Sequence, residues 1–169
     1  TRVAASRWIY SHVPGVVNLV VETDDGERLE PIPMPLDFTL QAGVPHLASF
    51  AAQVDGEAIS IVLPFVRDLS PGQGPRRLSI RLQESPDPEA AGIGAAFEGS
   101  LPADSETRLE IPFDVRWDVL QGRTYYLVME LEEAGAIAIS GNLAITYSTP
   151  TGEQEQSVDL PDGSLNLVA

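Results

Sequence analysis

Short apolar runs, many of them β-branched or alternating with polar residues, fill most of this chain. Runs of this length that are bounded by turn-forming residues are typical of β-strands. The pattern predicts strands at Val16–Glu22, Phe38–Leu40, Leu47–Val54, Ala58–Leu63, Leu78–Gln83, Thr107–Phe113, Thr124–Leu131 and Ile137–Tyr147.

The first fourteen residues, TRVAASRWIYSHVP, have a different period. Ala5, Trp8, Ile9 and His12 recur at three- and four-residue spacing, which places them on one face of a helix. Thr1 is a capping residue type, and a proline at the end of the run stops the helix. One short helix is therefore predicted, at the start of the chain.

Turn-forming residues separate the predicted strands: Asp24-Asp25-Gly26, Asp55-Gly56, Ser70-Pro71-Gly72, Gln121-Gly122, Ala134-Gly135 and Thr151-Gly152. Asp55-Gly56 lies between two apolar runs and is the strongest hairpin signal of the set. Two longer connections, Glu30–Pro35 and Ser85–Asp104, are rich in proline or glycine and are predicted as surface loops.

Many short strands with regular turns favour a mainly β fold, an antiparallel β-sandwich of the jelly-roll kind with a short N-terminal helix. An open barrel is the competing architecture, and the pattern does not decide between them. At 169 residues the chain has the length of one domain. We expect a helical lead-in at residues 1–15 and a single β-domain at residues 16–169.

Charge narrows the range of partners. The chain has 25 acidic and 10 basic residues and a net charge of −15. Binding to a nucleic acid needs a basic surface, so no nucleic-acid partner is expected. All ten basic residues are arginines, and cysteine is absent too, which excludes Schiff-base lysines, thiolate nucleophiles, disulfides and cysteine-ligated zinc.

The ends of the chain lead to an expectation about its context. No apolar run reaches the roughly 18 residues that a membrane-spanning helix needs, and Thr1–Pro14 lacks the apolar core of a signal peptide. The chain begins without methionine inside a predicted helix and ends in apolar residues. We expect it to be a piece of a longer polypeptide.

No catalytic residues are predicted. The two histidines, His12 and His46, lie outside any catalytic motif, and a helix-end role and a packing role are expected for them. A stand-alone hydrolase is disfavoured because the G-x-S-x-G motif of serine hydrolases is absent.

Two clusters of acidic residues are candidates for calcium, which prefers oxygen ligands. The first consists of Asp24, Asp25 and Glu27, and the second of Asp87 and Glu89. Neither follows the spacing of an EF-hand loop. No cofactor is expected apart from a structural calcium ion, for which the first cluster is the candidate site.

Aromatic side chains next to polar groups are what a sugar-binding surface needs. Trp117 and Tyr126 are the candidates for contact with carbohydrate. Tyr125 and Tyr126 are consecutive on a strand, so one points inward and the other outward. Trp117 has an alternative role as a cover over one end of the core.

Two segments resemble known families. Thr1–Pro14 contains Ala5, Ser6, Trp8, Ile9, Tyr10 and Pro14 of an A-S-x-W-I-Y-x-x-x-P helix, and Glu22, Asp24 and Asp25 follow in an acidic element, with Thr23 where the pattern has tryptophan. This resembles the segment after the last membrane helices of bacterial multi-spanning glycosyltransferases related to the dolichyl-phosphate-mannose-dependent enzymes. Leu109–Gly141 is similar to the terminal strands of galactose-binding-like jelly-roll domains through Leu120, Gly122, Thr124, Tyr125, Tyr126 and Leu127.

The resemblance implies a non-catalytic, extracytoplasmic domain of a membrane glycosyltransferase-like protein. Its partners would be the membrane portion of its own parent chain and a glycan or lipid-linked sugar. The alternative is a carbohydrate-binding β-sandwich module of a secreted or cell-surface protein.

Overall fold

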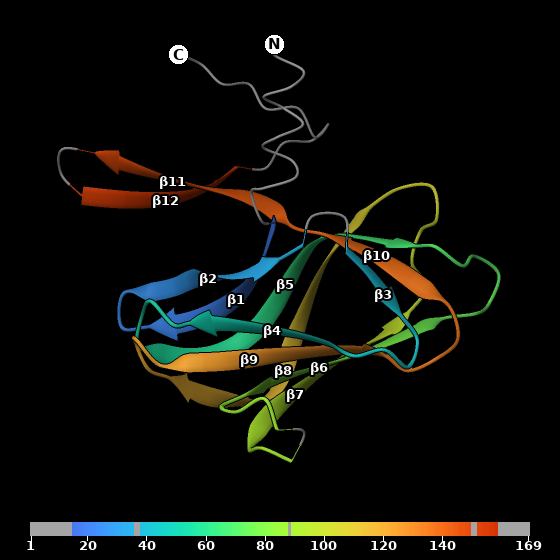
Figure 1. The fold of residues 1–169 in the computed structure, drawn as a ribbon, viewed down its shortest axis with the longest axis horizontal. Coiled ribbons are helices and arrows are strands. Elements are labelled where there is room, and N and C mark those ends of the chain that lie inside the picture. The colour runs from blue at the N-terminus through green and yellow to red at the C-terminus, as the bar shows by residue number, and fades with distance from the viewer. Residues whose placement is uncertain (1–14, 36–37, 88, 150–151, 159–169) are drawn as a thin grey trace, which may run out of the picture.

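The described part of the chain folds into one antiparallel sheet of twelve strands that is nearly closed into a barrel (Figure 1). This computed structural model describes residues 15–35, 38–87, 89–149 and 152–158. The strands are β1 (Gly15–Thr23), β2 (Gly26–Met34), β3 (Phe38–Gln41), β4 (His46–Ala51), β5 (Gly56–Asp68), β6 (Arg76–Gln83), β7 (Gly92–Gly99), β8 (Thr107–Val119), β9 (Thr124–Leu131), β10 (Ala136–Ser140), β11 (Asn142–Thr149) and β12 (Gly152–Val158).

The prediction of a mainly β, antiparallel fold is confirmed. Within the described residues there is no helix, and the helix predicted for Thr1–Pro14 lies outside them. The sandwich form of the fold stays a prediction.

The strand order around the barrel is β2-β1-β5-β8-β7-β6-β9-β4. β5 is central, because β8 pairs along one of its edges while β1 and β10 share the other. β1 is also paired at its first residues with β11, whose hairpin with β12 extends beyond the barrel at the upper left of Figure 1.

β2 and β4, the first and last strands of this order, do not pair with each other, and two sets of contacts close most of the gap in the barrel. Between β2 and β4, the buried carboxylate of Glu30 accepts hydrogen bonds from the backbone N–H of Gln53 at 2.7 and 3.0 Å. At the other end, the N–H of Ala42 donates to the carbonyl of Gly135, and that of Gly43 donates to the carbonyl of Leu131. The chain after β3 is thereby attached to the end of β9.

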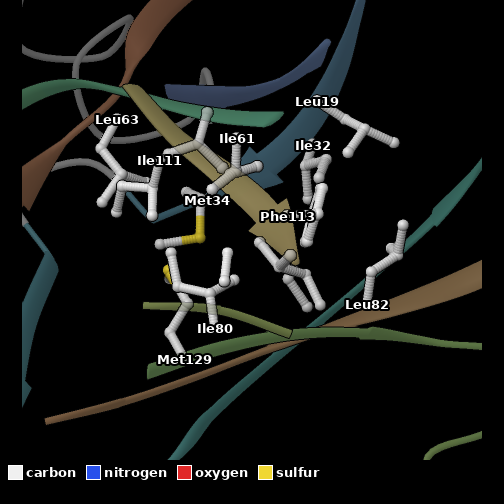
Figure 2. Close-up of a cluster of buried hydrophobic side chains, with 14 of the residues drawn as sticks. Leu19, Ile32, Met34, Ile61, Leu63, Ile80, Leu82, Ile111, Phe113 and Met129 are labelled. Carbon is white, nitrogen blue, oxygen red and sulfur yellow. The ribbon is translucent and has the colours of Figure 1, made fainter. Parts of the chain in front are cut away.

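The core fills the inside of the barrel. Figure 2 shows Met34, Ile61 and Ile111 on one side facing Ile80 and Met129 on the other. These side chains are buried and recur at every second position of their strands, as expected for strands with one face on a core.

Two predicted loops contain strands. Glu30–Pro35 is largely part of β2, and Ser85–Asp104 contains β7, so both loop predictions are wrong in these parts. Among the described residues, β2 pairs with β1 alone. Pro31 and Pro33 are two positions apart, so both of their missing N–H groups fall on the same edge of β2, and a strand paired along one edge tolerates proline when that is the other edge.

The hairpin predicted at Asp55-Gly56 is also wrong. β4 and β5, on either side of it, do not pair with each other: β4 pairs with β9, and β5 pairs with β1, β8 and β10. The turn signals at Gly26, Gly72, Gly122 and Gly135 coincide with positive φ angles and are confirmed.

Candidate functional site

An acidic hollow of about 470 Å³ lies at one end of the barrel. Three segments form it: the end of β1, the link from β4 to β5, and the end of β8. The residues that line it are Glu22, Thr23, Asp24, Asp55, Gly56, Glu57, Asp118, Val119 and Leu120, so five of the nine carry a carboxylate.

Gly56 allows these segments to approach one another. A Cβ atom at this position would lie 2.4 Å from the carbonyl oxygen of Glu22 and 2.6 Å from Cγ1 of Val21. The glycine is thus required for close packing of β5 against β1. Next to it, Asp55 accepts a hydrogen bond of 2.8 Å from the N–H of Gln121, which ties the link to the chain after β8.

Arg116 forms ion pairs with two of these carboxylates. Its Nη1 lies 3.0 Å from Oε2 of Glu57 and also forms an ion pair with Glu22. The hydrogen bonds to Glu57 and Glu22 raise the pKa of Arg116 above its ordinary value. All three side chains are exposed, so solvent screens the pairs strongly.

The hollow can attract cationic groups through its charge, since five carboxylates outnumber one arginine. It is not a metal cage: in the part of the chain that the structure describes, no three acidic or histidine side chains are placed to hold a metal ion. Of the predicted calcium ligands, only Asp24 lines the hollow. Asp25 and Glu27 are exposed at the tip of the β1–β2 hairpin.

The structure does not bring the two predicted sugar-binding residues together. Trp117 lies on β8 and packs against the core, with its ring edge-on to Tyr125 at a centroid distance of 6.1 Å. Tyr125 is fully buried, whereas Tyr126 is partly exposed on the opposite face of β9. The prediction that Tyr125 and Tyr126 point in opposite directions is confirmed. Trp117 is on the same side as the inward Tyr125.

The L-x-x-G-x-T-Y-Y segment has a structural role. Gly122 adopts a φ of 78°, and the phenolic oxygen of Tyr125 accepts a hydrogen bond of 2.9 Å from the N–H of Leu120. The turn into β9 is therefore fixed by the buried tyrosine.

Tyr126 is part of the outward surface of β4, β9 and β6. In the antiparallel register Tyr126 is opposite Ser49 of β4, and its strand neighbour Val128 is opposite Leu47 of β4 and Arg81 of β6. Residues directly opposite one another in a sheet share a face. We call this surface the Tyr126 face; it consists of Leu47, Ser49, Ala51, Arg81, Tyr126 and Val128.

His46 lies at a separate, small pocket of about 220 Å³. Its ring packs against Phe38 at a centroid distance of 4.2 Å, and its Nε2 atom is buried without a hydrogen-bond partner. Burial lowers the pKa of His46 below its ordinary value of 6.5. These contacts agree with the packing role expected for His46, whereas His12 lies outside the described residues.

The buried ion pair of Arg76 and Asp68 was not predicted from the sequence. Arg76 also donates to the carbonyl oxygens of Ala134 and Ser70, so it connects the turn before β10 to the chain after β5. A signal was present in the sequence: Arg76 lies two and four residues before Leu78 and Ile80, which point inward, so its side chain is on the inward side of β6 as well. The partner Asp68 was harder to find, because irregular pairing with β8 interrupts the alternation of β5.

Comparison of the sequence with models of protein families and with curated proteins finds no match. Among the described residues, no helix has the length and apolarity needed to cross a membrane.

Proposed function

We propose that this chain is a non-catalytic, extracytoplasmic domain of a membrane glycosyltransferase-like protein, and that it contacts a sugar donor or acceptor through the Tyr126 face. The resemblance of Thr1–Pro14 and of the acidic element after it to such transferases motivates the proposal. The jelly-roll relationship suggested by Leu109–Gly141 is part of the same proposal.

The observation that carries the proposal is the composition of the Tyr126 face. The chain has a net charge of −15, and the six residues of this face carry no carboxylate; the exposed Glu130, two positions after Val128 on the same side of β9, borders the face. The partly exposed Tyr126 has a serine opposite it, and Arg81 lies opposite the next outward residue, Val128, so the face offers a ring for stacking and polar groups for hydroxyls or a phosphate. A lipid-linked sugar presents both kinds of group.

The described residues support a role without catalysis. His46, the histidine among them, packs against Phe38 and has its Nε2 atom buried. Burial of Nε2 leaves this ring nitrogen out of reach of a substrate.

A carbohydrate-binding module of a secreted or cell-surface protein is the second candidate, and the same face favours it. The two candidates differ in the polypeptide that carries the domain. An antibody raised against the 169-residue domain tests this in fractionated cells of the source. A band much larger than the domain, in the membrane fraction and accessible to protease from outside, is expected for a transferase; a secreted band contradicts the transferase and leaves the module.

Binding through the Tyr126 face is tested on the purified chain with a glycan array and with titration of a soluble polyprenyl-phosphate sugar analogue. We expect Tyr126→Ala to abolish any signal. Leu29→Ala, which removes an exposed apolar side chain from β2, is the matched control and retains the signal. No binding by the unmodified chain, or equal binding by the Tyr126→Ala variant, would overturn the role of this face.

A further inference from the structure

Gln83, the last residue of β6, is buried although its side chain lies on the outer side of the sheet. Leu78, Ile80 and Leu82 of the same strand point into the core, so Gln83 points outward. In the antiparallel register it is directly opposite Tyr126 of β9, at the border of the Tyr126 face. Only 1% of Gln83 is exposed. A polar side chain is therefore covered next to the surface for which sugar contact is proposed.

The turn that follows β6, at Ser85–Asp87, lies against this side chain. Nε2 of Gln83 donates hydrogen bonds to the carbonyl oxygens of Ser85, at 2.6 Å, and Asp87, at 3.1 Å. Other hydrogen bonds are local: the N–H of Asp87 donates to Oγ of Ser85, and the N–H of Ala90 donates to the carbonyl of Asp87. The local bonds give the turn its shape, and Gln83 ties it to the sheet.

The amide group of Gln83 also has an acceptor that is not used. Its Oε1 atom is buried and has no hydrogen-bond partner in the described part of the chain. The orientation of the amide is defined, because the carbonyls of Ser85 and Asp87 can accept only from Nε2. A buried carbonyl oxygen without a partner costs free energy, and such atoms are rare in native proteins.

We propose that Gln83 is a specificity-determining residue of the Tyr126 face, and that its Oε1 atom accepts a hydrogen bond from a hydroxyl group of a bound sugar. This inference rests on the proposed function. A hydroxyl group supplies the single donor that Oε1 lacks. Directly opposite residues have Cβ atoms about 5 Å apart, so a sugar ring stacked on Tyr126 has hydroxyl groups near Gln83.

A sugar reaches Oε1 after the Ser85–Asp87 turn has moved away from it. Ser85 is partly exposed, and Pro86 and Asp87 are exposed, so little packing holds the turn in place. When the turn opens, Nε2 exchanges two carbonyl partners for water, and Oε1 gains a partner that it does not have in the closed form. A sugar hydroxyl then replaces this water at Oε1.

Two substitutions of Gln83 in the full chain test the proposal, with binding measured by titration of the array glycans and of the soluble polyprenyl-phosphate sugar analogue. Gln83→Met removes the acceptor and should weaken binding about tenfold, the size of one neutral hydrogen bond. Gln83→Glu keeps an acceptor and loses the donor that ties the turn, so it should bind at least as tightly as the unmodified chain. A role limited to holding the turn predicts equal losses in both variants.

The matched control is Gln73→Met, which makes the same change at an exposed glutamine before β6 and should leave the affinity unchanged. Circular dichroism checks the fold of each variant. A deoxy analogue that lacks the contacted hydroxyl should bind the unmodified chain and Gln83→Met equally well, since neither complex then has this hydrogen bond.

The outcomes separate this inference from the proposed function. Full binding by Gln83→Met together with loss of binding by Tyr126→Ala would overturn the role of Gln83 and leave the proposed function. Equal losses in Gln83→Met and Gln83→Glu would do the same. No binding by the unmodified chain would instead overturn the proposed function, and this inference with it.

Discussion

Arg76 holds Asp68 in a two-point contact inside the protein: its Nε lies 3.0 Å from Oδ1 of the carboxylate and its Nη2 lies 3.1 Å from Oδ2. Only 1% of the arginine side chain and 7% of the aspartate side chain are exposed. Two charges with so little water around them depend on each other, because either one alone would be buried without compensation.

Removal of one partner should therefore be costly. We expect Asp68→Ala to lower the free energy of unfolding by about 3–5 kcal/mol, measured by urea denaturation. The double variant with Asp68→Leu and Arg76→Met should recover much of this loss, because no charge is then left buried. Arg123→Ala breaks the exposed pair with Glu84 and should cost no more than about 1 kcal/mol. Equal losses for the two arginine-carboxylate pairs would contradict this account.

Gly56→Ala should destabilise the chain by about 2–3 kcal/mol, because the added methyl group overlaps with the backbone of Glu22. Gly94→Ala is the matched control. Its Cβ would meet the side-chain Oδ2 atom of Asp114 at 3.2 Å, and this exposed carboxylate can move aside. Thermal unfolding of both variants provides the comparison, and a Gly56→Ala variant as stable as the control would show that the β1–β5 contact can relax.

Trp117→Ala should cost about 3 kcal/mol in the free energy of unfolding, near the lower end for loss of a large aromatic side chain, since Trp117 is only partly buried. Tyr126→Ala should cost less than about 1 kcal/mol, because its side chain lies on the outer face of β9. Urea denaturation distinguishes the two. A smaller loss for Trp117 than for Tyr126 would indicate that their roles are reversed.

His46 should make the stability of the chain depend on pH. Its pKa is lower in the folded state than in the unfolded state, so the unfolded chain binds the proton more readily. The stabilising effect of the neutral ring is complete above the unfolded pKa and is lost as the pH falls through 6.5 toward the folded pKa. The melting temperature of the unmodified chain should therefore fall more than that of His46→Gln between about pH 8 and about pH 5.5. His12 is present in both proteins, so its titration does not affect the comparison. Melting temperatures that fall equally with pH in the two proteins would contradict the prediction.

Much of the strand content was predictable from local patterns. β9 has the predicted bounds, and β1 and β6 begin or end within two residues of the predicted positions. Their alternation is regular and their ends have clear turn signals. β2 and β7 were missed because proline in β2 and glycine and alanine in β7 resemble loop composition, while the pairing that makes them strands comes from residues distant in sequence.

The candidate site was less predictable for the same reason. Asp55-Gly56 has the composition of a hairpin turn, but the glycine is needed because β5 approaches the end of β1, a contact that local sequence does not encode. The acidic hollow likewise gathers carboxylates from three distant segments. The opposite orientation of Tyr125 and Tyr126 was predictable, since it follows from strand geometry alone.

The position of β5 has a consequence for the rate of folding. β5 pairs with β1, β8 and β10, and β4 pairs with β9 across the four strands that lie between them in the chain. Each of these pairings closes a long loop before its hydrogen bonds form, and folds dominated by such contacts form slowly, over milliseconds to seconds. The acidic, lysine-free chain thus stays partly open for a comparatively long time during folding, when its self-repulsion helps to keep apolar strands such as β1 from associating between molecules.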